Sequence, residues 1–316
     1  MDNYELLNQI VEEKAVIRHV SKHRNPDGSM DIAGNLKIWN DAVKQFNSIK
    51  LWDITPNYDD RDKNQIEPNV IFIHNKNNTK SGTIIVACGG GFETRTGCEG
   101  FNVAKRFVDE GFNCAILTYR LKPYSRKDAM DDMQRAIRLL RSKQNELNIN
   151  DKICCMGFSA GGMLSGNCAT HFDSGNIEDE DFIEHFSSRP DAVVIGYGAF
   201  CFSGLPQGFF NDPFSKTTHN PFFASSDELH YYSPEINIKP NSPPFFIWQT
   251  NSDDPRNSFA MGSALTAMGI PFEMHLFPEG VHGLALADGN NDLDMNIPST
   301  AQWVPLCVDW LHRQGI

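Results

Sequence analysis

The sequence is poor in basic residues, and it contains no run of them. Its 316 residues include 28 lysines and arginines against 40 aspartates and glutamates, which gives a formal net charge of -12. A negative field of this size repels phosphate backbones and anionic lipid headgroups. We therefore expect neither a nucleic acid nor a membrane surface among the partners of this protein.

Long hydrophobic runs are also missing. The first twenty residues mix acidic side chains with short apolar steps and lack the basic start and apolar stretch of a signal peptide. No segment reaches the length of a membrane span.

The eight cysteines lie mostly inside apolar segments, such as NCAIL and KICCMG, rather than at paired spacings in loops. This pattern is typical of free thiols in a reducing compartment, so we expect a cytoplasmic protein.

The sequence also lacks recognisable metal motifs, because it has neither a CxxC pair nor an HExxH segment. One acidic loop alternates oxygen ligands in the manner of a calcium loop, at Asp288, Asn290, Asp292 and Asp294. Leu293, however, occupies the place where the sharp turn of such a loop needs glycine, and no glutamate follows at the proper distance. We therefore expect a solvated acidic loop and no metal site.

From about residue 69 onward, short segments rich in β-branched residues alternate with amphipathic ones. The strand candidates are NVIFIHN, GTIIVACGGG, NCAILTYR, KICCMGFS, DAVVIGYG, FFIWQT and FEMHLF. Residues 126–148 place one apolar helical face at Met130, Met133, Ile137 and Leu140. Residues 300–313 do the same at Trp303, Leu306, Cys307, Trp310 and Leu311. This alternation predicts an α/β fold with a mostly parallel central sheet flanked by helices.

Two segments do not follow the alternation. Residues 1–68 are interpreted as a helical and irregular N-terminal segment, which precedes a catalytic domain at 69–316. Residues 173–240, approximately, contain one strand candidate and are otherwise rich in Phe, Pro, Ser, Asn and His. We interpret this stretch as a cap inserted over the top of the sheet. Its bulky side chains could narrow a binding pocket, among them Phe200, Phe202, Phe209 and Phe210.

The sharpest local signal is GFSAG at residues 157–161, between the strand candidate KICCM and an apolar helix candidate at 163–169. In the G-x-S-x-G pattern a nucleophilic serine projects from a tight turn between strand and helix. Glycine is needed two positions before and after the serine, because strand and helix approach closely there. The alternative is a glycine-rich turn that only joins the two elements. The context favours Ser159 as a nucleophile.

A triple glycine at residues 89–91 ends the strand candidate GTIIVA, some seventy residues before the serine. Hydrolases with the G-x-S-x-G motif place backbone N–H groups at this point to bind the developing oxyanion. A triple glycine alone is usually only a flexible turn. Its place at the end of a strand favours a role in an oxyanion hole.

Of the ten histidines, only His282 lies in a polar turn directly after a late strand candidate, in FEMHLFPEGVHG. A histidine on a loop can turn its ring toward a serine. His275 lies within the strand, and we expect its ring to face packed protein instead. His282 is therefore the candidate general base. The alternative is a turn histidine that merely satisfies a local hydrogen bond.

The acid of a Ser, Asp, His order is expected after the preceding strand candidate, where Asp253 and Asp254 are adjacent. Asp254 precedes Pro255, which is typical of a helix N-cap with proline at the first helical position. That role for Asp254 leaves Asp253 as the preferred acid and Asp254 as the alternative.

Six segments of the chain carry a family resemblance: CGGGF, TYRLKP, MQRAIRLLRS, GFSAGG, YYSPEINIKPNSPPFFIWQT and FPEGVHGLALAD. Together they resemble the acetyl-xylan-esterase-like branch of the α/β-hydrolases, often labelled sugar esterases or prolyl-oligopeptidase-like hydrolases, over about residues 69–315. The resemblance implies an α/β-hydrolase fold and a triad of Ser159, Asp253 and His282. It also implies an oxyanion hole formed by the N–H groups of Ala160 and of Gly90 or Gly91. The family commonly has Asp-x-x-Val-Pro after the acid strand, and this chain has the shorter NSDDPRNS.

The expected reaction is acyl transfer to water. Ser159 attacks an ester carbonyl, His282 takes and returns the proton, and Asp253 fixes the imidazole tautomer, so no cofactor is needed. The resemblance implies short acyl groups, acetyl above all, on a small-molecule ester such as an acetylated sugar or a small alcohol. Two rival functions stay open, a serine peptidase-like hydrolase and a non-catalytic ligand-binding homologue. The sequence also leaves the oligomeric state open, a homo-oligomer included.

Overall fold

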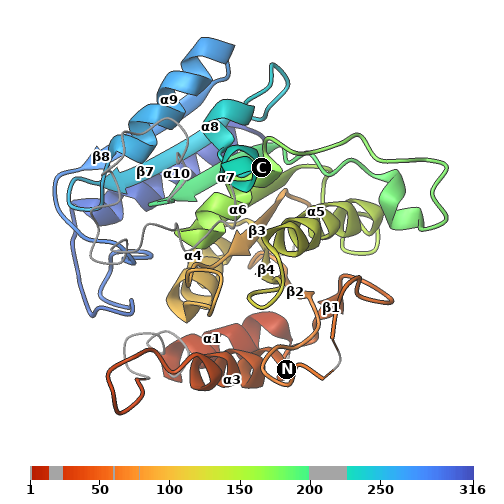
Figure 1. The fold of residues 1–316 in the computed structure, drawn as a ribbon, viewed down its shortest axis with the longest axis horizontal. Coiled ribbons are helices and arrows are strands. Elements are labelled where there is room, and N and C mark those ends of the chain that lie inside the picture. Colours follow the sequence, from red (N-terminus) through yellow and green to blue (C-terminus); the bar gives the residue numbers. More distant parts are fainter. Residues whose placement is uncertain (1, 14–23, 60, 78, 199–225) are drawn as a thin grey trace.

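The computed structural model describes residues 2–13, 24–59, 61–77, 79–198 and 226–316. Within these ranges one sheet of eight strands runs through the molecule, in the order β1-β2-β4-β3-β5-β6-β7-β8 (Figure 1). The strands are β1 (Ile49–Lys50), β2 (Asn69–Ile73), β3 (Thr83–Ala87), β4 (Asn113–Thr118), β5 (Ile153–Phe158), β6 (Ala192–Gly196), β7 (Phe245–Thr250) and β8 (Phe272–Phe277). The seven strand candidates of the sequence all form strands.

The sheet is parallel from β4 to β8, and β2 joins it antiparallel to both β4 and β1. The central strands β3 to β7 are buried along their whole length. Burial on both faces is the reason that these strands read as nearly continuous apolar runs in the sequence. The predicted α/β fold with a mostly parallel sheet is therefore confirmed.

Helices cover both faces of the sheet. They are α1 (Asn3–Glu13), α3 (Ile32–Val43), α4 (Val103–Asp109), α5 (Arg126–Ser142), α6 (Ala160–Cys168), α7 (Ser226–Tyr231), α8 (Pro234–Asn237), α9 (Arg256–Met268) and α10 (Trp303–Arg313). Short turns lie at η1 (Cys98–Asn102, π-helical), η2 (Phe182–His185) and η3 (Thr300–Gln302), the last two 3₁₀-helical. Side chains of α1, α3, α4 and α10 pack in one core layer, and those of α5, α6 and α9 pack in the other.

Alternation along each strand divides the core into these two layers. In β3, Ile84 and Val86 pack with the first layer, whereas Ile85 and Ala87 pack with the second. The other parallel strands alternate in the same way, because successive side chains of a strand point to opposite faces. The sheet is therefore packed between two layers of buried apolar side chains.

Two helix predictions differ in detail from the structure. The predicted helix at 126–148 ends at Ser142, and the residues that follow form turns. Its start is fixed by a capping box, in which Ser125 and Asp128 exchange hydrogen bonds with each other's backbone N–H groups. The prediction that Leu306 lies on the buried face of the last helix is wrong. This residue is 36% exposed, whereas Trp303, Cys307 and Trp310 on the same helix are buried.

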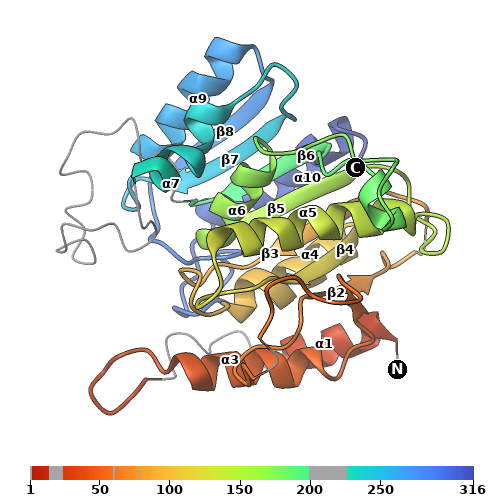
Figure 2. The ribbon, with the colours of Figure 1, turned by 45° about the vertical axis from the view of Figure 1, so that its right-hand side comes forward.

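The N-terminal helices lie at the β2 edge of the sheet, and α9 lies beside β7 and β8 near the opposite edge (Figure 2). Leu7 of α1 and Trp39 of α3 are fully buried in the same core layer as α4 and α10. The Trp39 indole N–H donates a hydrogen bond to Thr118 Oγ1 at 3.2 Å. Residues 2–13 and 24–59 therefore contribute side chains to the core beside the sheet.

The cap expected at 173–240 falls partly on residues 199–225, which lie outside the described residues together with Phe200, Phe202, Phe209 and Phe210. Its described flank at 173–198 is held to α5 by ion pairs. Arg135 contacts Asp181 and Glu184 at 2.6 Å each, and Arg138 contacts Asp173 at 2.6 Å. These charged pairs hold residues 173–191 beside α5, and the sheet strand β6 separates them from residues 199–225.

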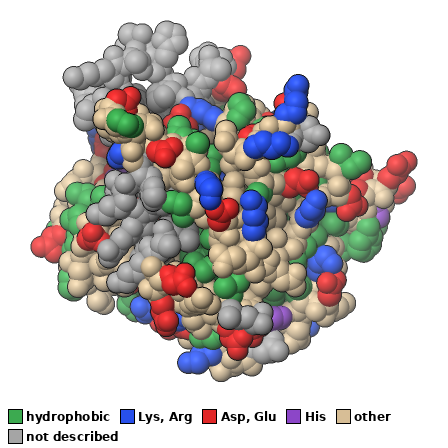
Figure 3. Space-filling model, turned by 90° about the horizontal axis from the view of Figure 1, so that it is seen from below, with side chains coloured by type: hydrophobic (Ala, Val, Ile, Leu, Met, Phe, Trp, Pro, Cys, Tyr) green, Lys and Arg blue, Asp and Glu red, His purple; other side chains and the backbone are tan. Residues whose placement is uncertain are grey.

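The surface charges, the helices and the cysteines can be compared with the expected partners and compartment. On the coloured part of the face in Figure 3, acidic and basic side chains lie interspersed among hydrophobic ones. No helix in the described ranges has the length and apolar character needed to cross a membrane. Seven cysteines in those ranges are free and buried, and Cys201 lies outside them.

Candidate active site

Ser159 occupies the turn between β5 and α6, at the carboxyl end of the sheet. Its backbone angles are φ 50° and ψ -119°, a conformation that costs a non-glycine residue about 1–3 kcal/mol. The turn is held by hydrogen bonds on both sides, since the Ser159 N–H donates to Gly196 O and the Met163 N–H donates to Ser159 O, each at 3.0 Å. The strained backbone directs the Ser159 side chain out of the strand and toward the neighbouring loops.

The glycines of the motif are required by close backbone contacts. A β-carbon on Gly157 would lie 2.0 Å from the carbonyl oxygen of Gly161. A β-carbon on Gly161 would lie 2.1 Å from the carbonyl oxygen of Ala87 in β3. Because backbone cannot move aside as a flexible side chain can, only glycine fits at these two positions. The local sequence GFSAG is therefore what allows the tight turn at Ser159.

His282 lies on the loop after β8, and the fold brings it to the serine. Its Nε2 atom is 2.7 Å from Ser159 Oγ. The ring packs edge-on against Tyr197, with ring centroids 5.0 Å apart. The His282 side chain is 46% exposed, so substrate and water can reach it. This is the geometry that a general base needs, with the base within hydrogen-bond reach of the proton that it removes.

Asp253 lies on the loop after β7 and meets the other side of the same ring. Its Oδ2 atom is 2.8 Å from His282 Nδ1. The loop is anchored by the Gln249 amide, which donates to the Asp253 carbonyl, and by the Asp253 N–H, which donates to Thr250 O at 3.2 Å. Because a carboxylate only accepts, Nδ1 carries the hydrogen in this pair, and Nε2 is left to accept from the serine hydroxyl.

The alternative acid, Asp254, points elsewhere. Its carboxylate accepts hydrogen bonds from the Arg256 backbone N–H at 3.2 Å and from the Arg256 guanidinium at 2.5 and 2.7 Å. The expectation that Asp254 is the N-cap is wrong, because α9 begins at Arg256 and Pro255 is its N-cap residue. Asp254 has φ 45°, which turns the chain two residues before the helix and directs its side chain to Arg256.

The expected oxyanion donors lie at the start of α6 and in the loop after β3. Gly90 and Gly91 have φ angles of +127° and +64°. Their N–H groups have no hydrogen-bond partner among the described residues. Ala160 is the first residue of α6, where a backbone N–H lacks a partner within the helix and the helix dipole is positive. Gly89, which directly precedes these two glycines, lies against the serine, since a β-carbon on it would be 2.8 Å from Ser159 Cβ.

Other polar residues singled out in the sequence do not gather into a site. His275 lies on the edge strand β8 and contacts Glu273 at 2.8 Å. The acidic loop pairs Asp288 with Asn296 in a short antiparallel bridge. Across the described ranges, no group of three or more His, Cys, Asp or Glu side chains could hold a metal ion.

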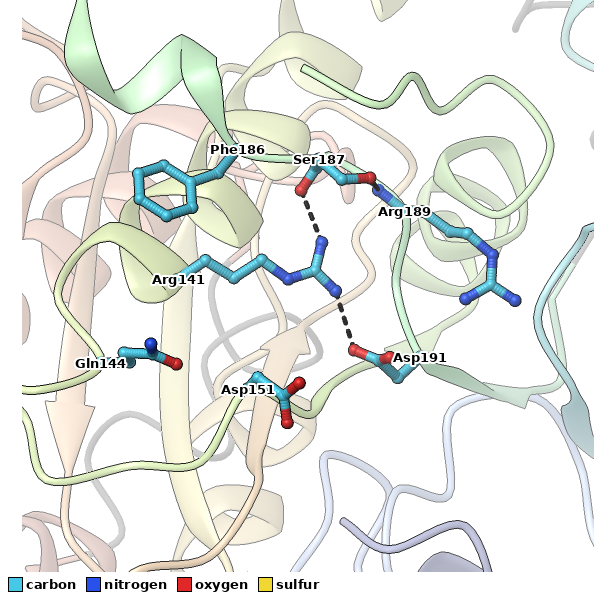
Figure 4. A pocket seen from close by; sticks show the side chains of 7 residues that line it. All are labelled: Arg141, Gln144, Asp151, Phe186, Ser187, Arg189 and Asp191. Atoms are coloured by element: carbon cyan, nitrogen blue, oxygen red, sulfur yellow. Dashed lines mark hydrogen bonds and ion pairs between the residues drawn. The ribbon is translucent and has the colours of Figure 1, made fainter. Parts of the chain in front are cut away.

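A hollow of about 350 Å³ lies away from the serine (Figure 4). It is lined by Arg141, Gln144, Asp151, Phe186, Ser187, Arg189 and Asp191. Arg141 crosses it, with a guanidinium that donates to Ser187 O at 2.5 Å and to Asp191 at 2.8 Å. Asp151 and Asp191 precede β5 and β6, so the hollow lies at the amino ends of the strands. Ligands of open α/β sheets bind at the carboxyl ends, where Ser159 lies.

Two buried residues near the serine had no place in the sequence interpretation. Tyr197 follows β6, and Glu99 lies in η1, each less than 3% exposed. Their side chains are joined by a 2.8 Å hydrogen bond from the tyrosine hydroxyl to the carboxylate. Tyr197 directly follows the strand beside β5, and that position at the carboxyl end of a parallel strand is the one signal that the sequence offers for it.

Comparison with known proteins gives the following similarities. The chain matches the BD-FAE family model over residues 70–259. It is 33% identical over 230 residues to endo-1,4-β-xylanase B of Butyrivibrio fibrisolvens, an alignment that covers 70% of this chain and 35% of that protein. The chain thus corresponds to about a third of the length of this curated relative.

Two solved structures are similar over most of the chain. One is an acetyl ester-xyloside bifunctional hydrolase from Caldicellulosiruptor lactoaceticus, with a TM-score of 0.75, 30% identity, and coverage of 85% of this chain and 96% of that chain. The other is a sugar hydrolase from Lactococcus lactis, with a TM-score of 0.64, 25% identity, and coverage of 84% and 97%. The expected fold agrees with these neighbours.

Proposed function

The chain belongs to the BD-FAE family of α/β-hydrolases, a group of esterases and sugar hydrolases, and on that premise we propose that it is a serine carboxylesterase. The proposal includes a preference for short acyl groups, acetyl above all. The observation that carries it is the continuous chain of hydrogen bonds from Ser159 through His282 to Asp253, at 2.7 and 2.8 Å.

The first half-reaction follows from this geometry. As Ser159 Oγ attacks the ester carbonyl, His282 Nε2 takes the hydroxyl proton, and the carbonyl oxygen becomes negative. The N–H groups of Ala160 and of Gly90 or Gly91 would stabilise that oxygen. The ring then donates the proton to the departing alcohol, which leaves an acyl-serine.

In the second half-reaction water attacks the acyl-serine, and His282 acts again as the base and then as the acid. Asp253 holds the ring in one tautomer and stabilises its positive charge in both halves. The half-exposed ring gives the water a route to the acyl group. Every atom that this cycle uses comes from the chain, the substrate or water.

The substrate class rests on the relatives. A neighbour at 30% identity is named as an acetyl ester-xyloside hydrolase, and the curated relative is named as a xylanase. We therefore propose an acetylated xylo-oligosaccharide, or a sugar of similar size, as the natural substrate. Free, buried thiols among the described cysteines fit a cytoplasmic site of action, where small sugar esters would arrive after the polymer has been cut.

The test compares the wild type with Ser159→Ala on a panel of substrates. The panel holds p-nitrophenyl acetate, butyrate and octanoate, acetylated xylo-oligosaccharides, and a proline-containing peptide amide. We expect the fastest release from acetate, measurable deacetylation of the oligosaccharides, no amide cleavage, and no turnover in the variant. An octanoate rate far above the acetate rate would contradict the short-acyl preference. Faster cleavage of the amide would indicate a peptidase, and a wild type without any turnover would indicate a binding protein.

A further inference from the structure

Glu99 is a charged side chain buried directly behind the candidate active site. It lies in the π-helical turn η1 and is 2% exposed. Its Oε2 atom accepts a hydrogen bond from the Gly89 N–H at 2.6 Å, and its Oε1 atom accepts one from the Tyr197 hydroxyl at 2.8 Å. A carboxyl group removed from water is costly, so a site that keeps one there calls for an explanation.

The hydrogen bonds define the charge state of Glu99. The Tyr197 oxygen accepts the Ala285 N–H at 2.8 Å, which directs the tyrosine's own hydrogen to Glu99. Both carboxylate oxygens therefore face donors, the Gly89 N–H and the Tyr197 hydroxyl, which is the pattern that an ionised carboxylate accepts. The pKa of Glu99 is raised above its ordinary value, because the effect of burial outweighs the lowering by the hydrogen bonds from Tyr197 and Gly89 and by the positive charge that His282 can carry. The arrangement fits the anionic form.

Glu99 also connects the two loops that carry the proposed catalytic groups. Gly89, which it holds, directly precedes the oxyanion glycines. Ala285, which it reaches through Tyr197, follows His282 by three residues on the same loop. A β-carbon on Gly89 would lie 2.7 Å from Glu99 Oε2 and 2.8 Å from Ser159 Cβ. The carboxylate thus lies immediately behind the nucleophile, with only a glycine between them.

We propose that Glu99 is a positioning residue, whose carboxylate fixes the oxyanion loop and, through Tyr197, the histidine loop, and adds a second negative charge that stabilises the His282 imidazolium. The inference rests on the proposed esterase function. It assigns to Glu99 an electrostatic contribution in addition to that of Asp253. Because the charge and the hydrogen bonds are already in place before substrate binds, they cost nothing to reorganise during the reaction.

Few of the titratable groups that face Glu99 change their charge within the pH range of an activity assay. The titratable groups around it are Cys88, Cys98, Tyr119, Tyr197, His282 and Asp292. Burial raises the pKa of the two thiols and the two phenols, that of Cys88 to about 12, so these four stay neutral. The acid limb of the kcat/KM profile therefore reports on His282 and on Glu99 itself, whose pKa burial raises.

The test is Glu99→Gln, which keeps the size of the side chain and removes its charge. We expect kcat on a short ester to fall about 10- to 100-fold with KM within about threefold, the loss expected for a hydrogen bond to a charged group. We also expect the acid limb of kcat/KM to move to lower pH by roughly half a unit, because removal of a nearby anion disfavours the imidazolium. A role in packing alone would leave that limb in place.

Glu93→Gln is the matched control. Glu93 stands near the same loop, is 43% exposed and pairs with Lys122, so loss of its charge should change neither kcat nor the pH profile. Tyr197→Phe is the second variant, needed if Glu99→Gln does not fold. It should lower kcat by a similar factor, and the double variant should lose little beyond the larger single loss, since both residues act through one chain.

The outcomes separate this inference from the proposed function. A wild type that neither hydrolyses esters nor reacts with a fluorophosphonate would end the proposed function. If the wild type turns over and folded Glu99→Gln keeps its kcat and its acid limb, the inference alone is overturned. Losses that multiply in the double variant would also overturn it, because they would show that Glu99 and Tyr197 act independently.

Discussion

Replacement of Asp253 by asparagine should remove most of the activity and leave the fold intact. In the structure the Asp253 carboxylate accepts from His282 Nδ1 at 2.8 Å, which leaves Nε2 free to accept the serine proton. Asparagine has the same size, but its amide can donate toward Nδ1. That interaction favours the tautomer with the hydrogen on Nε2, which cannot take a proton from Ser159.

The magnitude follows from what the ring loses. In serine proteases the equivalent change lowers turnover about 10⁴-fold, or about 5 kcal/mol of transition-state stabilisation. The His282 side chain is 46% exposed and Asp253 is 19% exposed, so water can partly replace the lost partner. We therefore expect a loss of about 10³- to 10⁴-fold in kcat on a short ester, with a melting temperature close to that of the wild type.

Asp254→Asn is the control for this change. It removes a carboxylate one residue away, on the side chain that contacts Arg256 and not the histidine. The assay is kcat on p-nitrophenyl acetate with the melting temperature of each variant, and Asp254→Asn should stay within about threefold of the wild type. The reasoning is refuted if Asp253→Asn stays active while Asp254→Asn does not, since the second acid would then orient the ring.

Three further changes test the surrounding structure. Gly161→Ala should destabilise the fold by several kcal/mol, seen in chemical unfolding, because its β-carbon would lie 2.1 Å from Ala87 O; wild-type stability would contradict the tight turn. Asp254→Ala should lower the free energy of unfolding by about 1–2 kcal/mol, because the variant loses the hydrogen bonds with Arg256 and places alanine at φ 45°. Asp254→Asn should leave the free energy of unfolding nearly unchanged. In Cys201→Ser, Ellman's reagent should find no reactive thiol in the native protein and seven after denaturation, and rapid native labelling would contradict their burial.

The strands β2 to β7 could be predicted because each one is buried along its whole length, which leaves a short apolar run bounded by turns. The ends of the helices were harder to predict from the sequence. The residues after Ser142 contain neither glycine nor proline, so no local signal marks the point where the chain leaves α5. Leu306 shows the same limit, because its exposure depends on how α10 is rotated against the sheet, and apolar spacing alone does not fix that rotation.

The site was accessible from sequence where its signals are local. The glycines around Ser159 and the order of strand-end residues identify the three side chains that the structure brings together. Glu99 and Tyr197 were not accessible, because their hydrogen bond joins residues 98 positions apart and neither belongs to a local motif. A buried carboxylate cannot be told from an exposed one by its neighbours in the chain, since only the fold shows what covers it.

The most direct test of the central claim is the site of reaction with a fluorophosphonate, read by intact mass and peptide mapping. The account predicts one adduct per chain, on the peptide that contains Ser159, with none in Ser159→Ala and very slow labelling in His282→Ala. Labelling of another residue, or equal labelling of Ser159→Ala and the wild type, would contradict the claim that Ser159 is the activated nucleophile.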